Sequence, residues 1–197
     1  MCIIIKRSEY MKNNIKDNKK KIIVAITGAS GVIYGTKLVE ALKAAGVQTY
    51  VVVTKNAKKV ADYENVKLPK SDFNEEEIDA SIASGSFKTD GMIVCPCSMK
   101  SLAAISHGYA DNLVARAADV MLKEKRKLVL VLRETPMNAI HLENALKLSR
   151  LGVQIMPACP GFYHKPKTLE DIVKFFVGKI LDQFEIDNKL YKRWEKS

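Results

Sequence analysis

The sequence has few cysteines, a single tryptophan and no long apolar run. Its 197 residues include only four cysteines, at positions 2, 95, 97 and 159, with no Cys-x-x-Cys pair and no histidine at zinc-finger spacing. This pattern excludes a zinc finger and a disulfide-stapled scaffold. No stretch reaches the roughly 18 apolar residues of a membrane-spanning helix, and the run at 2–5 is too short for a signal-peptide core. We therefore expect reduced thiols, no metal site and a cytoplasmic location.

Acidic residues are outnumbered by basic ones. The chain has 32 Lys and Arg against 22 Asp and Glu, a formal net charge of +10. Such a charge favours an anionic partner, which could be a phosphate-bearing small molecule, a nucleic acid or a membrane surface. Residues 1–20 hold six basic and two acidic residues, so we expect a disordered basic extension there. The hydrophobic share of 47% is that of one globular domain, placed at 21–197.

Short apolar runs alternate with amphipathic segments from Lys21 onward. The runs predict strands at Ile22–Ile26, Val47–Val53, Met92–Cys95, Leu128–Leu132 and Val153–Met156. They are almost wholly apolar, as in strands buried on both faces of a parallel sheet, so the pattern predicts a doubly wound α/β fold. We expect the face of the first helix that carries residues 38, 41, 42 and 45 to be buried. We also expect a polar helix, part of a lid, within 67–89 and a last helix that begins at Thr168 with a capping box to Asp171.

Two of the predicted turns are typical of a phosphate site. The first strand leads through residues 27–31, Thr-Gly-Ala-Ser-Gly, directly into a helix, which predicts free backbone N–H groups at a helix N-terminus. The glycine spacing does not match a dinucleotide fingerprint or a Walker loop. Thr54 and Lys55 follow the second strand, where a nicotinamide site would have an acidic residue. The turns favour a mononucleotide such as FMN, with an ordinary glycine-bearing turn as the alternative.

Further chemistry-bearing residues follow the later strands. Residues 98–101 form a hydroxyl-rich turn after the third strand, and Arg133 and Glu134 follow the fourth. Arg133 and Glu134 could serve the site or form a surface ion pair, and Thr135 with Pro136 predicts the start of the next helix. Tyr163 and Lys179 could close over an anionic substrate.

The histidines and the C-terminal tryptophan point to no particular chemistry. His107, His141 and His164 show no ligand spacing, so we expect packed or surface side chains. Trp194 could anchor a solvated basic tail or gate the site.

The sequence resembles the UbiX-type flavin prenyltransferases in six blocks that follow the family's order. The resemblance extends from about Lys21 to the C-terminus. The blocks are 28–31, 97–101, 111–113, 116–119, 133–136 and 160–164. The resemblance implies a flavodoxin-like single domain and a homododecamer that holds FMN between subunits. It implies transfer of a dimethylallyl group from dimethylallyl phosphate to N5 and C6 of reduced FMN, without a metal. The product would pass to a UbiD-type decarboxylase, and neither nucleic acid nor membrane would be a partner.

The resemblance also implies roles for individual residues. The residues expected to bind FMN are Gly28, Ala29, Ser30, Thr54, Ser98, Met99, Lys100, Ser101 and Arg133. Those expected to bind the prenyl phosphate are Lys123, Arg133, Tyr163 and Lys179. Those expected to be catalytic are Ser30, Glu64, Lys123 and Glu134, with Glu134 relaying protons. Lys179 stands where many relatives have Arg, so bidentate phosphate binding is lost while the charge stays.

Three other functions are alternatives. A related FMN-dependent decarboxylase of cysteinyl substrates would need an early catalytic histidine and a Pro-Ala-Ser-Ala-Asn block, and residues 31–35 and 96–99 match neither. Some relatives carry decarboxylase names, so the chain could itself decarboxylate aromatic acids. A basic nucleic-acid-binding module is disfavoured because no aromatic residues interleave with the basic ones.

Overall fold

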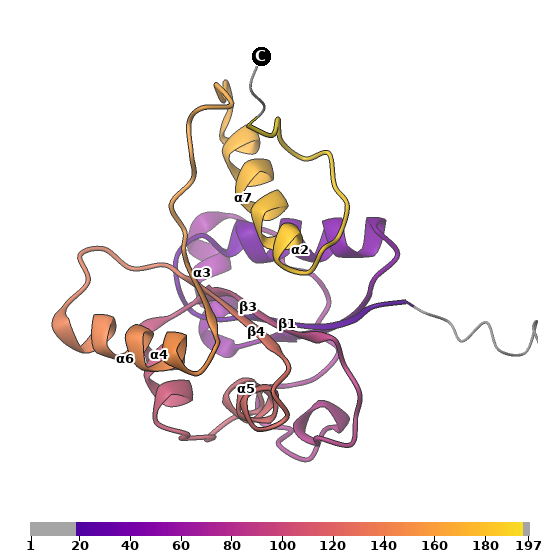
Figure 1. The fold of residues 1–197 in the computed structure, drawn as a ribbon, viewed down its shortest axis with the longest axis vertical. Coiled ribbons are helices and arrows are strands. Elements are labelled where there is room, and N and C mark those ends of the chain that lie inside the picture. Colours follow the sequence, from indigo (N-terminus) through magenta and orange to yellow (C-terminus); the bar gives the residue numbers. More distant parts are fainter. Residues whose placement is uncertain (1–18, 195–197) are drawn as a thin grey trace, which may run out of the picture.

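The computed structural model describes residues 19–194 and shows a five-stranded parallel sheet in the order β2-β1-β3-β4-β5 (Figure 1). The strands are β1 (Lys21–Ile26), β2 (Gln48–Val53), β3 (Gly91–Cys97), β4 (Lys127–Leu132) and β5 (Gln154–Pro157). Each lies within two residues of its predicted position, and the order is that of the flavodoxin-like fold, as predicted. Residues 1–18, which are most of the predicted basic extension, lie outside the described residues.

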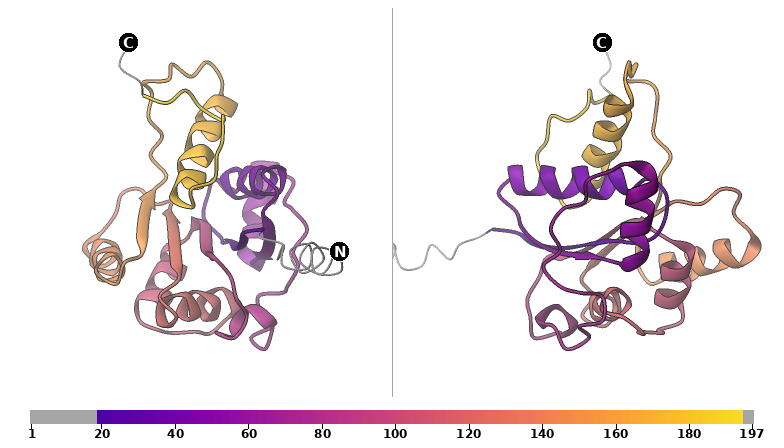
Figure 2. Two further views of the ribbon diagram at one scale, coloured as in Figure 1. Left: turned by 45° about the vertical axis from the view of Figure 1, so that its right-hand side comes forward. Right: turned by 180° about the vertical axis from the view of Figure 1, so that it is seen from behind.

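Helices cover both faces of the sheet (Figures 1 and 2). One face packs against α2 (Val32–Ala44), α3 (Lys55–Glu64) and α7 (Leu169–Gln183), and the other against α4 (Met99–Ser106), α5 (Leu113–Lys123) and α6 (Ala139–Arg150). Buried side chains alternate between the two cores along each strand, which is why the strand sequences are mainly apolar and polar residues occur only at their amino ends. Within residues 19–194, no helix combines the length and the hydropathy needed to cross a membrane.

Helix α2 lies close against the sheet because of a glycine. A Cβ atom on Gly35 would collide with the carbonyl oxygen of Cys95 in β3. Leu38 and Leu42 are fully buried on the predicted apolar face, while Ala45 follows the helix as an exposed C-cap residue. The predicted face is therefore confirmed except at its last position. Close packing at Gly35 fixes where the N-terminus of α2 lies relative to β3.

The predicted helix within residues 67–89 is wrong. The segment contains only the 3₁₀ turn η1 (Ser81–Ala83) and runs beside the edge strand β2. The backbone N–H of Val51 donates to Oδ2 of Asp72 (2.8 Å), and that of Val53 donates to the Ser71 hydroxyl (3.0 Å). The polar side chains of this segment satisfy the edge of the sheet instead of lining the solvent face of a helix.

Helix α6 begins later than the sequence predicts. Its N-cap is Asn138, whose side chain accepts from the backbone N–H of His141 (2.9 Å) in a capping box. The expected start at Thr135 and Pro136 is wrong, since both precede the helix in an irregular loop. Asparagine satisfies orphan N–H groups at least as well as threonine, so the later cap prevails. At α7 the predicted capping box of Thr168 and Asp171 is confirmed.

Candidate active site

Hydrogen bonds at the carboxyl ends of the strands align the loops that follow them. Thr54 N–H donates to Ile26 O (3.1 Å), Arg133 N–H to Cys97 O (3.4 Å) and Ala158 N–H to Leu132 O (2.8 Å). The loops therefore follow one another along this edge in strand order. The switch point of this topology, where ligands of flavodoxin-like proteins bind, lies between β1 and β3. The predicted FMN-binding residues are therefore brought to a single edge of the sheet.

Thr27 joins the first loop to the third. Its buried hydroxyl donates to the carbonyl oxygen of Pro96 (2.8 Å) and accepts from the backbone N–H of Ser98 (2.9 Å). The Thr27 N–H also donates to Pro96 O (3.2 Å). The sequence pattern alone assigns this residue no role. A hydroxyl directly after a buried strand was the available signal.

The first loop also lies close to the start of α3. A Cβ on Gly28 would lie 2.5 Å from Cβ of Asn56 and 3.2 Å from its carbonyl carbon, so only glycine fits. Thr54 caps the same helix, because its hydroxyl accepts from Ala57 N–H (3.2 Å). That hydroxyl keeps its own proton to donate to a ligand.

Glu64 caps the N-terminus of α2, which corrects the prediction of free backbone N–H groups there. Gly31, the N-cap, has the left-handed φ of 86° and no side chain to cap the helix. The two carboxylate oxygens of Glu64, the last residue of α3, accept from Gly31 N–H (2.7 Å) and Val32 N–H (3.1 Å). A carboxylate there is also favoured by the helix dipole. These two N–H groups are therefore not free to bind phosphate. The sequence pattern predicts free N–H groups at this helix N-terminus, and for Gly31 and Val32 that prediction is wrong.

Helix α4 offers a more open N-terminus. Ser98 caps it by accepting from Ser101 N–H (3.3 Å), and the two hydroxyls lie 3.1 Å apart. The N–H groups of Met99 and Lys100 have no acceptor within residues 19–194. The Lys100 ammonium pairs with Asp111 (3.2 Å). This turn therefore presents two backbone donors and two hydroxyls beside the first loop, where Ser30 is exposed.

Arg133 and Glu134 do not pair with each other, so the ion-pair alternative is wrong. Arg133 is half-buried, and its Nε atom is fully buried without a hydrogen-bond partner in the described structure. Glu134 instead accepts from the backbone N–H of Thr135 through Oε1 (2.9 Å). A buried guanidinium donor without an acceptor costs free energy unless an anion or a carbonyl oxygen supplies one. Together with the hydroxyls and N–H groups of the neighbouring loops, this donor fits a phosphorylated flavin.

The cysteines near this edge are structural. Cys95 and Cys97 are fully buried, and burial raises the pKa of the Cys97 thiol to about 12. Burial also raises the pKa of Cys95 far above its ordinary value. Neutral buried thiols are poor nucleophiles and poor metal ligands. The described residues contain no group of three or more potential metal-binding side chains.

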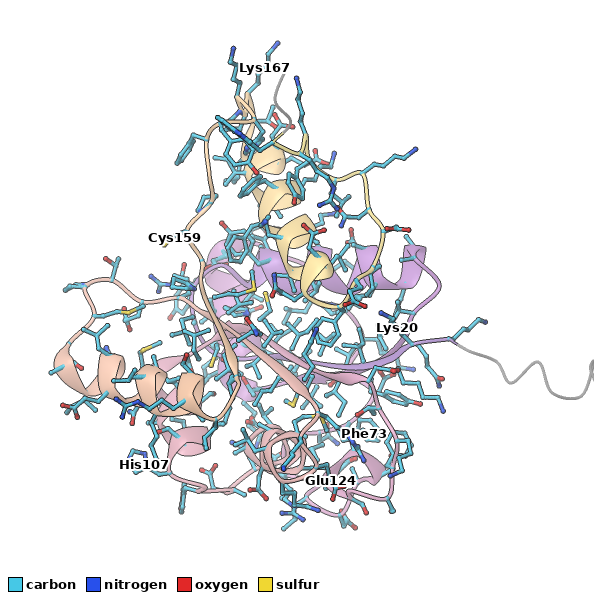
Figure 3. All side chains as sticks on the ribbon, viewed as in Figure 1. Lys20, Phe73, His107, Glu124, Cys159 and Lys167 are labelled. Atoms are coloured by element: carbon cyan, nitrogen blue, oxygen red, sulfur yellow. The ribbon has the colours of Figure 1, made fainter. Side chains whose placement is uncertain are left out.

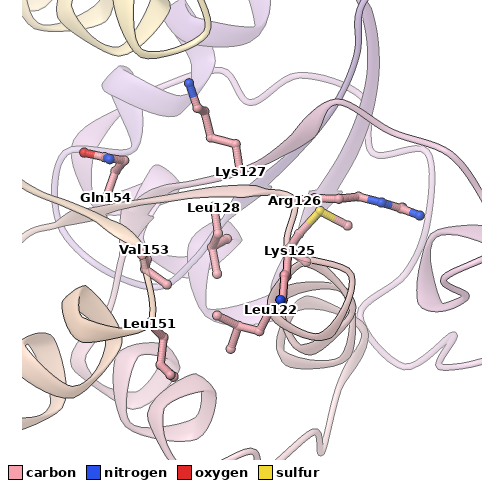
Figure 4. Close-up of a pocket in the computed structure, with 10 residues that line it drawn as sticks. Leu122, Lys125, Arg126, Lys127, Leu128, Leu151, Val153 and Gln154 are labelled. Carbon is pink, nitrogen blue, oxygen red and sulfur yellow. The ribbon is translucent and has the colours of Figure 1, made fainter.

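Lys123 is not at this edge. It ends α5, which leads into the amino end of β4, and its ammonium pairs with Glu124 (2.6 Å). Figure 3 shows Glu124 and Cys159, which follows β5, on different sides of the molecule. A cavity of about 580 Å³ lies beside the amino ends of β4 and β5 (Figure 4), lined by residues 121–122, 125–128 and 151–154. None of its lining residues is predicted to bind FMN or substrate.

Tyr163 and Lys179 lie around α7, and within residues 19–194 no hydrogen bond, ion pair or ring contact joins either side chain to Arg133 or Ser30. The Tyr163 ring packs edge-to-face on Phe175 (5.5 Å between centroids). The Lys179 ammonium lies 5.9 Å from the centre of the Tyr191 ring. One chain therefore brings the predicted FMN-binding residues and Glu134 to the carboxyl edge. Lys123 lies at the other end of the sheet, and Tyr163 and Lys179 make their ring contacts with α7 and the segment that follows it.

Comparison with known proteins shows the family of this chain. The Flavoprotein family model matches residues 10–181. "Flavin prenyltransferase UbiX" of Methanothermobacter thermautotrophicus is 48% identical, over 89% of this chain and 95% of that protein. A crystal structure of a UbiX protein in complex with FMN and dimethylallyl pyrophosphate superposes with a TM-score of 0.88 at 44% identity, over 91% of this chain and 100% of that one.

A second solved structure bears on assembly. It is described as a dodecameric FMN-dependent UbiX-like decarboxylase from Escherichia coli O157:H7, and it is 49% identical with a TM-score of 0.84, over 89% of this chain and 100% of that one. An FMN-dependent cysteine decarboxylase superposes at only 15% identity, with a TM-score of 0.53, which shows a shared fold alone. The chain therefore belongs to the Flavoprotein family and, within it, to the UbiX-type flavin prenyltransferases.

Proposed function

We propose that this protein transfers the dimethylallyl group of dimethylallyl phosphate to reduced FMN. The observation that carries the proposal is the buried, unpartnered Arg133 donor, set in a row of hydroxyl and N–H donors at the carboxyl edge of the sheet. The flavin prenyltransferase relatives at 48–50% identity, and the similar structure that holds FMN and dimethylallyl pyrophosphate, support it. The weaker identity of the cysteine decarboxylases disfavours the decarboxylase alternative.

The first and third loops would hold FMN. Reduced FMN, when bound, supplies the electron-rich nitrogen and ring carbon that receive the prenyl group. The backbone N–H groups of Gly28 and Ser30, the Thr54 hydroxyl and the α4 N-terminus would donate hydrogen bonds to it, and Arg133 would supply the cation. The Ala29 N–H already donates to Thr27 O (2.8 Å), so Ala29 would contribute packing only. Since the reactive atoms belong to the flavin, the chain's task is orientation and placement of charge. Thr27 serves this task by locking the two loops together.

The prenyl phosphate would be bound between subunits. Arg133 lies at the carboxyl edge, whereas Lys123 lies at the opposite end of the sheet, and neither Tyr163 nor Lys179 forms a hydrogen bond or ion pair with Arg133 in the described structure. In a homododecamer, like that of the Escherichia coli relative, a neighbouring subunit can bring these side chains to Arg133. Cations around the phosphate stabilise the charge that develops as it leaves.

Glu134 would hold and release a proton. Its Oε1 atom is occupied by the N–H of Thr135, so Oε2 is the oxygen available for proton transfer. The hydroxyl of Ser30, exposed between the first loop and α4, can contact both FMN and the prenyl phosphate.

The test is the mass of the flavin after turnover. Purified protein is incubated anaerobically with reduced FMN and dimethylallyl phosphate, and the extracted flavin is weighed by mass spectrometry. We expect a flavin heavier by one prenyl unit, and much less of it with Glu134→Gln. If FMN binds and returns unmodified, with the monophosphate and with the diphosphate, the transferase proposal fails. Release of CO2 from cysteinyl or aromatic acids would then support the alternative.

The proposal extends to the protein's setting. The prenylated flavin would serve as the cofactor of another enzyme, and a UbiD-type decarboxylase is the proposed recipient. A cytoplasmic location is part of the same proposal, supported by the low cysteine content and the two buried, neutral thiols of β3.

A further inference from the structure

The chain reverses after α7 and runs back along it. Residues 185–194, here called the C-terminal segment, begin with Glu185 in a left-handed turn (φ 54°) and continue with Ile186, whose N–H donates to Leu181 O (3.2 Å). Figure 1 shows this segment passing alongside α7 toward the C-terminus. Ile186 is buried in the core, and Leu190 and Tyr191 pack against it. The segment is therefore held on α7 at defined points.

One carboxylate makes most of the polar contacts of this segment. Asp182 on α7 accepts hydrogen bonds from the Tyr191 hydroxyl (2.6 Å), from Nδ2 of Asn188 (3.0 Å) and from the guanidinium of Arg193 (2.7 and 3.2 Å). Its side chain is only 17% exposed. Charge-assisted hydrogen bonds converging on a shielded carboxylate are stronger than ordinary surface pairs. We call Asp182 with Tyr191 and Arg193 the Asp182 latch.

The packing under the latch leaves little freedom. A Cβ on Gly178 would lie 2.5 Å from the Tyr191 ring, so this glycine lets the C-terminal segment approach the α7 backbone. The Tyr191 ring also packs on Phe175 (5.0 Å between centroids). Trp194, the next residue after Arg193, packs edge-to-face on Tyr163 (5.3 Å, 84°). The latch thus lies directly before the contact between the end of the segment and a predicted substrate-binding tyrosine.

We propose that Asp182 is a positioning residue for the prenyl-phosphate site, because it holds the C-terminal segment where Trp194 packs on Tyr163. This role rests on the proposed function, in which Tyr163 contacts the prenyl phosphate. Trp194 is 74% exposed, so its own burial contributes little to fixing it, and the hydrogen bonds of the latch supply the restraint. A pre-ordered aromatic pair loses less conformational entropy when substrate binds.

The first experiment measures the segment itself. Trp194 is the only tryptophan in the sequence, so time-resolved fluorescence anisotropy of the purified full chain reports on it alone. In Asp182→Asn we expect the fast component of the decay to grow about twofold as the segment gains motion. Tyr191→Phe, which keeps the ring on Phe175 and removes only the hydroxyl, should give a smaller change of the same sign. Glu185→Gln is the matched control, since Glu185 is exposed on the same segment and its side chain makes no hydrogen bond or ion pair in the described structure.

The second experiment separates positioning from folding. For Asp182→Asn we expect the KM for dimethylallyl phosphate to rise about tenfold, with kcat and the Kd for FMN unchanged within about twofold. Asp182→Glu, which keeps the charge, should recover part of the loss. Unchanged anisotropy in both Asp182→Asn and Tyr191→Phe would overturn the latch. A change in anisotropy without a change in KM would overturn the positioning role. If the wild-type protein forms no prenylated flavin, the proposed function fails and the positioning role with it, while the anisotropy still decides whether the latch holds the segment.

Discussion

Arg133 carries a guanidinium nitrogen that is buried and has no acceptor within residues 19–194. A buried donor without an acceptor destabilises the ligand-free protein, and it stabilises the complex with a ligand that supplies the acceptor. In Arg133→Met the side chain keeps its apolar stem and loses the unsatisfied donor. We expect the free energy of unfolding of the flavin-free protein to stay the same or rise by about 1 kcal/mol, while the affinity for FMN falls at least about tenfold.

Urea unfolding and FMN fluorescence titration measure the two effects. Arg150→Met is the control, because Arg150 is exposed on α6 and its side chain makes no hydrogen bond in the described structure, so both quantities should stay unchanged. Loss of several kcal/mol of stability in Arg133→Met would show that Arg133 is structural.

Glu64 gives the opposite prediction, because both of its oxygens are used by the protein itself. In Glu64→Gln one oxygen is replaced by an NH2 group that cannot accept from a backbone N–H, and the charge at the α2 N-terminus is lost. We expect a loss of about 1 kcal/mol in stability, seen as a fall of a few degrees in Tm. Asp62→Asn, on the same turn of α3 and exposed, should leave Tm unchanged. An unchanged Tm in Glu64→Gln, together with lost activity, would assign Glu64 a chemical role instead.

At the level of single residues, the sequence predicts most of the residues that lie at the carboxyl edge of the sheet. It does not predict the hydrogen bonds that join them. Hydroxyls, glycines and Arg133 come directly after predicted strands, so their placement follows from topology. Glu64 caps α2 through hydrogen bonds to Gly31 and Val32, which lie 33 and 32 positions earlier in the sequence. A contact over that separation leaves no local sequence pattern. The same is true of Thr27, whose partners lie 69 and 71 positions away. Contacts of this kind depend on how close two elements pack, which side-chain periodicity does not encode.

Among the elements, the strands were predictable and some helix boundaries were not. A strand buried on both faces must be apolar at every position, and this signal survives without knowledge of its neighbours. Residues 67–89 carry polar side chains whose partners are N–H groups of the edge strand β2, so their local composition suggests a helix that does not form. The predicted start of α6 was wrong because two good capping residues, Thr135 and Asn138, lie three positions apart, and the helix begins after the second.

The Asp182 latch makes the C-terminal segment sensitive to pH at both extremes. Burial acts to raise the pKa of Asp182, but hydrogen bonds from Arg193, Tyr191 and Asn188 outweigh it and hold the pKa below its ordinary value. Burial, followed by the hydrogen bond to Asp182, raises the pKa of Tyr191 to about 12. The contribution of Asp182 to stability is therefore present above about pH 3.9 and is lost as pH falls through its lowered folded-state pKa. That of Tyr191 is present below about pH 10 and is lost as pH rises toward 12.

The charged neighbours of the latch are Lys179 over the Tyr191 ring and Asp187 near Arg193. We expect the Trp194 anisotropy to be constant between about pH 5 and pH 9 and to fall outside this window. Asp182→Asn removes the titrating carboxylate, so its acid-side transition should disappear while the alkaline one remains. An acid transition that persists in Asp182→Asn would assign it to another group.

For the whole molecule, the decisive feature is that the proposed site is divided between distant surfaces. The carboxyl edge of the sheet holds Ser30, Arg133 and Glu134, and the far end of α5 holds Lys123. No motion within a compact domain brings these together without unfolding α5. The proposed activity therefore requires an assembly, and the 22.0 kDa chain should be found as a much larger particle.

Mixed assemblies test this requirement directly. Chains with Lys123→Ala keep an intact carboxyl edge, and chains with Arg133→Ala keep an intact Lys123. If Lys123 acts on a neighbouring subunit's Arg133, each variant alone is nearly inactive. Co-assembled in equal amounts, they should regain about a quarter of the wild-type activity, because half of the edges are intact and half of their neighbours supply Lys123.

Formation of prenylated flavin by co-expressed, separately tagged variants measures the recovery, and native mass spectrometry confirms that hetero-oligomers form. Two edge variants mixed together, Arg133→Ala with Glu134→Gln, are the matched control. Both residues belong to the same edge, so every site in that mixture lacks one of them and no activity should return. Recovery in the first mixture and not in the second would show that the site is completed across a subunit boundary. If neither mixture recovers although hetero-oligomers form, Lys123 does not complete the site of a neighbouring subunit.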